Sequence, residues 1–152
     1  MKRDTWIAAG AFLSIPLAIL SASVICTYAI ARGASMQWRM LFRLFCHGIP
    51  KRCLTLWEVP MPICARCTAV YAGFLAGLLL FIFFPWIEER LLRLFLFVAS
   101  APMIIDGVTQ ALRLRESTND LRIATGLAAG LSFGMWALGA IERPQRGEFS
   151  TS

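Results

Sequence analysis

"CTAVYAGFLAGLLLFIFFPWI" occupies Cys67–Ile87 and contains no charged residue. A helix of about 20 apolar residues is long enough to cross the hydrocarbon core of a bilayer. Lipid offers no partner to an exposed backbone N–H or C=O group, and a helix satisfies these groups internally. The segment therefore predicts a membrane helix and decides the class of the whole fold.

Three further segments have the same character. Residues 6–31 and 123–141 carry no charge, and residues 94–112 carry one, at Asp106. Across the chain 58% of residues are hydrophobic, whereas ordinary soluble domains contain about 45–50%. We predict an all-α membrane protein with four transmembrane helices, in which residues 1–152 form a single integral membrane domain.

The first segment has an alternative interpretation as a cleaved secretory signal, because Lys2 and Arg3 precede its apolar run. The apolar core of such signals is typically about 7–15 residues long. The run in this chain is longer, so we retain it as a helix.

The connection between the first two helices is long and contains two different features. Residues 35–47 place Met36 and Met40 on one helical stripe and Arg39 and Arg43 on another. A helix with separate apolar and basic faces is suited to the membrane interface. We predict an interfacial amphipathic helix over residues 35–47. It is followed by a Cys/His-rich loop over residues 45–67, which holds four of the five cysteines and the only histidine.

This loop indicates a metal site. Cys64 and Cys67 have the CxxC spacing with which two thiols bind one tetrahedral metal ion or close a disulfide. Cys46 and His47 complete a set of four ligands, with Cys53 as a substitute. We predict zinc as the cofactor of this set. The alternative is a group of inert thiols.

Asp106 is the one charge within a predicted membrane helix. A carboxylate in that position is costly unless it is paired or hydrated, and it therefore suggests a functional site. Gln110 and Arg113 follow on the same helical face, and Arg122 opens the next helix. Two helix crossings return the chain to the membrane face that it left, so we expect these residues to lie near Arg66 and the cysteines. A buried ion pair that only fixes helix register is the alternative.

Glycines repeat every four residues in two of the predicted helices, at Gly73 and Gly77 and at Gly126, Gly130 and Gly134. Small residues at this spacing let helix backbones approach closely. The spacing therefore predicts close helix packing and carries no chemistry.

Four segments stand out between Phe45 and Gly130: "CHGIPKR", "CARCTAVYAG", "DGVTQ" and "LRIATG". Together they resemble a family of small predicted membrane proteins of bacteria and archaea, domain of unknown function family 2085. The resemblance implies that these segments form a shared site, and that serine is more usual at the position of Cys53. The family name carries no function, so the resemblance leaves the reaction open.

Three functions fit these features. In a metalloenzyme, zinc would polarise the substrate or activate water, and Asp106 and His47 would serve as catalytic acid–base groups. An anionic amphiphilic or lipid-linked substrate would be bound by Arg66, Gln110, Arg113 and Arg122. A non-catalytic protein would use zinc structurally and bind lipid. A thiol–disulfide redox protein would use the CxxC pair. A transporter is a weaker fourth hypothesis, because four helices form a thin pore unless the chain assembles as a homo-oligomer.

The formal net charge of +6 indicates membrane lipids as partners, anionic head groups in particular. We expect no nucleic-acid partner, because the sequence contains no recognisable nucleic-acid-binding module. Nine of the fifteen Lys and Arg residues fall on the side of the Cys/His-rich loop and six on the other. The positive-inside rule predicts a protein of the cell (inner) membrane with this loop on the cytoplasmic side, where thiols stay reduced.

Overall fold

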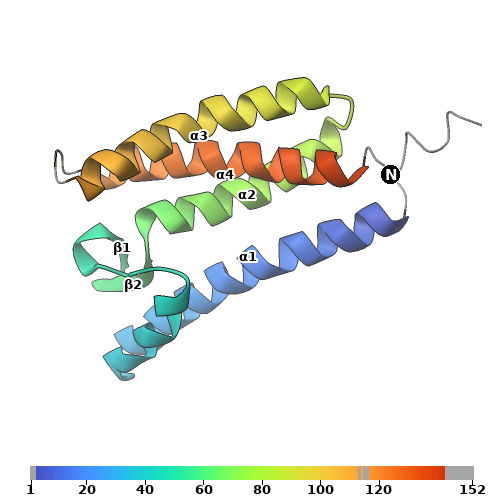
Figure 1. The fold of residues 1–152 in the computed structure, drawn as a ribbon. Helices are drawn as coiled ribbons and strands as arrows, with labels where there is room; N and C mark the ends of the chain where they lie inside the picture. Colours follow the sequence, from blue (N-terminus) through green and yellow to red (C-terminus); the bar gives the residue numbers. More distant parts are fainter. Residues whose placement is uncertain (1–2, 113, 115–116, 143–152) are drawn as a thin grey trace, which may run out of the picture.

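The computed structural model describes residues 3–112, 114 and 117–142. Its long helices are α1 (Arg3–Ala31), α2 (Ala65–Phe83), α3 (Glu89–Ala111) and α4 (Asn119–Glu142), which run side by side as a bundle (Figure 1). Within the described residues, four helices are long and apolar enough to cross a membrane. The predicted all-α membrane fold is therefore confirmed.

The helix ends differ from the predicted ones on both sides of the turn between α2 and α3. Helix α2 stops at Phe83, since Pro85 lacks a backbone N–H and restricts the residue before it. Helix α3 begins at Glu89 and includes a charged first turn that lies before the apolar segment. Glu89 and Arg93 form an ion pair of 3.5 Å across that turn, and an acidic side chain is favourable near a helix amino terminus.

Glycines bring α2 and α4 into close contact. A Cβ atom on Gly130 would lie 2.2 Å from the carbonyl oxygen of Val70, and one on Gly77 would lie 2.2 Å from that of Leu131. No side chain fits at such distances, so glycine is required at both positions. The close approach predicted from the glycine spacing is confirmed, and it makes α2 and α4 the central pair of the bundle.

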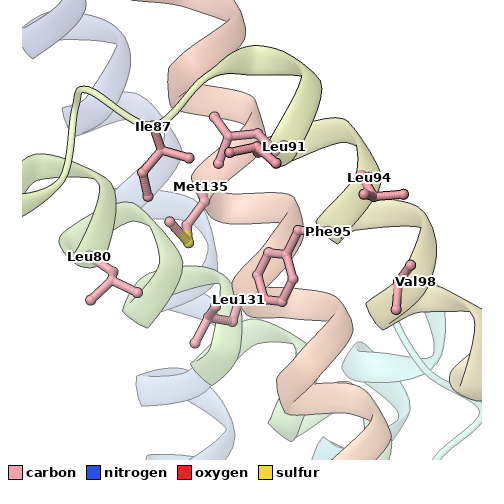
Figure 2. A pocket seen from close by; sticks show the side chains of 9 residues that line it. Leu80, Ile87, Leu91, Leu94, Phe95, Val98, Leu131 and Met135 are labelled. Carbon is pink, nitrogen blue, oxygen red and sulfur yellow. The ribbon is translucent and has the colours of Figure 1, made fainter.

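The remaining helices pack around this pair. Helix α3 packs against α4, and α1 packs against α2 and the loop region that precedes α2. The buried core joins α2, α3 and α4 through Phe81, Leu92 and Leu138. An apolar groove of about 550 Å³ lies near the α2–α3 turn, and Figure 2 shows its aliphatic and aromatic lining from Leu80 to Met135. Such a surface suits lipid contact and not water.

The predicted interfacial helix is a 3-10 helix, η1 (Met36–Leu44), and is shorter than residues 35–47. Ser35 caps its start by accepting a hydrogen bond of 3.3 Å from the backbone N–H of Gln37. Phe42 is its one buried residue, while Met36, Met40 and Leu44 are exposed. The segment therefore has the amphipathic character that the sequence predicts.

A β-hairpin in the Cys/His-rich loop was not predicted. After a short 3-10 turn, η2 (Pro50–Arg52), the strands β1 (Cys53–Leu56) and β2 (Val59–Cys64) pair antiparallel. Two prolines in β2 argue against a strand. The two-residue turn is Trp57–Glu58, with φ angles of 51° and 64°, where Asn-Gly is the usual signal. Because of these two features, the sequence did not predict the hairpin.

Candidate metal centre and adjoining polar network

Three cysteines meet where the hairpin joins α2. Cys46 follows η1, Cys64 ends β2, and Cys67 lies in the first turn of α2. Each sulfur lies within 4.8 Å of the other two. We call these three residues the sulfur group. All five cysteines of the chain are present as free thiols.

Backbone N–H groups hold the sulfurs in place. Cys64 is the N-cap of α2, and its Sγ accepts a hydrogen bond of 3.5 Å from the N–H of Cys67. The Sγ of Cys46 accepts from the N–H of Cys64 at 3.3 Å and from that of Gly48 at 3.5 Å. Donors of this kind stabilise a thiolate, which is the metal-binding form of cysteine.

The segment after η1 returns to the hairpin because of Gly48. Its φ of +56° is in the left-handed region, and a Cβ there would lie 2.7 Å from the carbonyl oxygen of Pro62. Arg39 supports the same contact, since its Nη2 donates to the carbonyl oxygens of Gly48 at 3.3 Å and of Met61 at 3.1 Å. Cys46 is thereby brought onto the start of α2.

Two cysteines outside the membrane helices have pKa values that are shifted in opposite directions. Hydrogen bonds from the Cys64 and Cys67 thiols lower the pKa of Cys46 to about 2. Burial raises the pKa of Cys53 to about 11, and its thiol donates to the carbonyl oxygen of Ile49 at 3.2 Å. Cys53 lies opposite Cys64 in the register of the two strands, but it is not a member of the sulfur group. It is therefore a poor ligand beside Cys46.

The sulfur group has the dimensions of a metal site. Zn–S bonds of about 2.3 Å at tetrahedral angles place two sulfurs about 3.8 Å apart. Sulfurs that already lie within 4.8 Å of one another need only small rotamer changes to reach that spacing. Within the described residues, this is the one group of three or more Cys, His, Asp or Glu side chains with metal-binding geometry.

His47 does not belong to the sulfur group in this structure. Its side chain is exposed, and it lines a pocket together with Arg39, Arg43 and Cys46. Consecutive residues direct their side chains apart, so proximity in sequence to Cys46 does not bring the imidazole to the other two sulfurs. Its metal-binding and catalytic roles stay predictions.

A polar network adjoins the sulfur group and links α2, α3 and α4. Arg66, which lies between Cys64 and Cys67 in sequence, forms an ion pair with Asp106 Oδ2. Gln110 Nε2 donates to the same oxygen at 2.8 Å. Arg122 Nη2 donates to Gln110 Oε1 at 3.4 Å. Asp106 and Arg122 are each only 6% exposed, so the network is largely shielded from solvent.

Guanidinium groups outnumber carboxylates among the described residues of this region. Arg122 interacts electrostatically with two other cations, Arg52 and Arg66. It also interacts with the acidic groups of Asp106 and Cys64. Three guanidinium groups and one carboxylate therefore share one end of the bundle, beside the sulfurs. Such an arrangement is suited to an anion. Arg113, the remaining predicted substrate-binding residue, lies outside the described residues.

Sequence reasoning missed two members of this region. Asn119 Oδ1 accepts a hydrogen bond of 2.8 Å from Arg122 Nη1. The hydroxyl of Thr118 takes a capping position at the start of α4, accepting from the N–H of Leu121 at 3.4 Å. The i, i+3 spacing of Asn119 and Arg122 makes them neighbours on one helix face and could have indicated their hydrogen bond. Arg52 was visible only as one position of the "CHGIPKR" segment.

Comparisons with known proteins agree with the extent of this site. The family of unknown function DUF2085, described as a predicted membrane protein, matches residues 46–136. An uncharacterized protein of Methanocaldococcus jannaschii is 34% identical over 147 residues, which cover 91% of this chain and 92% of that protein. An uncharacterized protein of Methanothermobacter thermautotrophicus is 35% identical over 96 residues, 63% of this chain and 86% of that protein.

No solved structure matches the chain. The family match begins at Cys46 and includes both the sulfur group and the polar network. It also agrees with the four apolar helices, which are long enough to span a membrane. The resemblance identified from the sequence is confirmed, and the chain belongs to the DUF2085 family of predicted membrane proteins.

Proposed function

We propose that this membrane protein binds a thiophilic divalent metal ion, preferentially zinc, through Cys46, Cys64 and Cys67. The observation that carries the proposal is the convergence of three sulfurs from two separate chain segments to within 4.8 Å of one another. Thiolate ligands favour zinc and other soft ions over magnesium or calcium. Backbone donors to Cys46 and Cys64 support the deprotonated state that such binding requires.

Three protein ligands leave one position of a tetrahedral ion open, which is the arrangement of catalytic zinc sites. We infer a metal-dependent reaction at this position, in which the ion would act as a Lewis acid or activate water. His47 is the candidate for a fourth ligand or a proton-transfer group, since it adjoins Cys46 on an exposed loop. A protein with His47 as a permanent ligand would have a closed, structural site instead.

The polar network suggests the class of substrate. Arg66, Gln110 and Arg122 would bind the anionic group of an amphiphilic or lipid-linked molecule whose apolar part remains in the bilayer. Asp106 accepts the hydrogen bonds of Arg66 and Gln110 on the same oxygen, Oδ2. It therefore orients Arg66 and Gln110, and its other oxygen is the one that would exchange a proton in acid–base catalysis.

Metal content tests the proposal directly. The full chain is purified in detergent, and metal per chain is measured for the wild type and for Cys64→Ser, Cys67→Ser and Cys26→Ser. Cys26 lies in α1, outside the sulfur group, and is the matched control. We expect about one zinc per chain in the wild type and the control, and loss of the metal in the other two variants. A metal-free wild type of intact fold would contradict the proposal.

His47→Ala separates the catalytic from the structural version of the site. Retention of the metal indicates three sulfur ligands and an open position. Loss of the metal indicates four protein ligands, which favours a non-catalytic protein with structural zinc and lipid binding.

A thiol–disulfide redox function is the second candidate. The observation that favours it is the position of Cys64 at the N-cap of α2, with Cys67 one turn later and donating its N–H to the Cys64 sulfur. CxxC pairs at helix amino termini have lowered thiol pKa values and exchange disulfides. A metal-free protein with a reversible Cys64–Cys67 disulfide would establish this function in place of the metal site.

A further inference from the structure

A second polar pocket adjoins Cys46 and is separate from the network of Arg66, Asp106 and Arg122. Its volume is about 230 Å³, and it lies between η1 and the segment that connects η1 to the hairpin. Its polar lining comes from Arg39, Arg43, Cys46 and His47, and its apolar lining includes Met36 and Met40. Among the described residues, no carboxylate lines it.

The basic side chains that line this pocket differ in how firmly they are held. Arg39 is fixed, because its Nη2 donates to two backbone carbonyl oxygens, those of Gly48 and Met61. Its Nε is buried and has no hydrogen-bond acceptor among the described residues. Buried donors are almost always paired in folded proteins. Arg43 and His47 are exposed and offer further donors at the mouth of the pocket.

We propose that this pocket binds a phosphate-type oxyanion at the membrane surface. Guanidinium groups match phosphate oxygens through paired, charge-assisted hydrogen bonds. The pocket volume greatly exceeds the roughly 30 Å³ share of one water molecule, so it accommodates a phosphate group with part of its hydration. Met36 and Met40 give a phosphate ester an apolar wall that leads along η1, whose apolar residues are largely exposed.

This site goes beyond the proposed metal centre and does not depend on it. Its arginines belong to η1, whereas the anion-binding residues proposed above belong to α2, α3 and α4. The ligand chemistry is shared by two sources, a lipid head group and free phosphate. Both are therefore included as probes in the experiment.

Calorimetric titration of the full chain in detergent provides the test. The probes are dihexanoyl phosphatidic acid, inorganic phosphate and, as a zwitterionic control, dihexanoyl phosphatidylcholine. The variants are Arg43→Gln, Arg43→Lys and Lys51→Gln. Lys51 is exposed in the same connection but does not line the pocket, so its variant removes the same charge without changing the site.

We expect phosphatidic acid to bind the wild type, and Arg43→Gln to weaken this binding about ten-fold, the effect of one hydrogen bond to a charged group. Lys51→Gln is expected to stay within about two-fold of the wild type, and Arg43→Lys to recover part of the loss. Comparable binding of inorganic phosphate identifies free phosphate as the ligand, whereas binding of phosphatidic acid alone identifies a lipid head group.

Three outcomes would overturn the site. The first is the absence of binding of both phosphate probes to the wild type. The second is an equal loss in Arg43→Gln and Lys51→Gln, which would show that general surface charge accounts for the signal. The third is equal binding of phosphatidylcholine, which would show that micelle partitioning does. Metal per chain in Arg43→Gln is measured in parallel and is expected to equal that of the wild type. Failure of the oxyanion site is thereby distinguished from failure of the metal proposal.

Discussion

Asp106 is a buried carboxylate in a helix that is apolar enough to cross a membrane, and its partners explain how it is accommodated. Arg66 forms an ion pair with it, and Gln110 donates to the same oxygen. Removing one member of a buried pair leaves an uncompensated charge, which is far more destabilising than the absence of both members. The ion pair therefore links α2 to α3, and substitution of Arg66 or Asp106 alone is expected to lower the stability of the fold strongly.

We predict that Asp106→Asn lowers the free energy of unfolding by about 3 kcal/mol, because it leaves the Arg66 charge without a counter-ion. Thermal unfolding of the purified protein in detergent measures the effect. The double variant Arg66→Gln/Asp106→Asn is expected to regain much of the stability. Equal losses that simply add in the double variant would show that the two side chains do not stabilise each other.

Cys53 differs from Cys46 in burial and acidity, since Cys53 is buried and its pKa is raised whereas that of Cys46 is lowered. The Cys53 thiol is buried and donates to a backbone carbonyl oxygen. We predict that Cys53→Ser retains the wild-type metal content, since a serine hydroxyl is of similar size and donates the same hydrogen bond. Elemental analysis alongside Cys64→Ser checks this. Loss of the metal in Cys53→Ser would make Cys53 a ligand and require the hairpin to rearrange.

At the scale of elements, the α2–α4 contact is the tightest in the bundle. A Cβ atom on Gly130 would collide with backbone atoms of α2, whereas one on Gly10 in α1 would meet nothing within 4 Å. We predict that Gly130→Ala destabilises the protein by about 1–3 kcal/mol, the usual cost of overpacking. Gly10→Ala is the control and is expected to stay within about 1 kcal/mol of the wild type. Thermal unfolding of both variants in the same detergent compares them, and equal stabilities would contradict the observed helix spacing.

The elements could be predicted from the sequence to different degrees. Long apolar segments indicate membrane helices because a segment in lipid must satisfy its own backbone hydrogen bonds, and a helix does so within one segment. The glycine spacing predicted close backbone approach in α2 and α4, and the structure shows that they approach each other. The hairpin could not be predicted, because its strands are short, contain Pro60 and Pro62, and turn through Trp57 and Glu58. There, tertiary contacts outweigh local preference: Trp57 packs edge-on against Tyr28 of α1, with ring centroids 5.4 Å apart.

At the scale of the whole molecule, the chain returns to one end of the bundle after α3. Figure 1 shows the hairpin, the carboxyl end of α3 and the start of α4 at that end. This convergence follows from the number of helices and their short connections, so the sequence alone predicts which residues come together. The direction of each side chain does not follow from topology. For that reason the position of His47 and the Asn119–Arg122 bond emerged only from the structure.

The orientation in the membrane remains a prediction based on nine basic residues against six. Lys51 and Glu88 are exposed. Lys51 lies in η2, directly before the hairpin, and Glu88 is the N-cap residue of α3. Figure 1 shows the hairpin and the start of α3 at opposite ends of the bundle. We predict that a membrane-impermeant maleimide labels Glu88→Cys in intact cells, and labels Lys51→Cys only after permeabilisation. The two variants serve as controls for each other. The reverse labelling pattern would place the sulfur group outside the cytoplasm.

The close sequence spacing of the sulfur group has a consequence for biosynthesis. Cys46, Cys64 and Cys67 are all translated before α2 is complete, and closing short loops costs little chain entropy. The partner of Arg66, in contrast, lies 40 residues further along the chain. A nascent chain that extends through α1, η1, the hairpin and the first turn of α2 therefore already contains every cysteine of the sulfur group. The polar network that we propose to bind an anion is completed later, since α3 supplies Asp106 and Gln110 and α4 supplies Arg122.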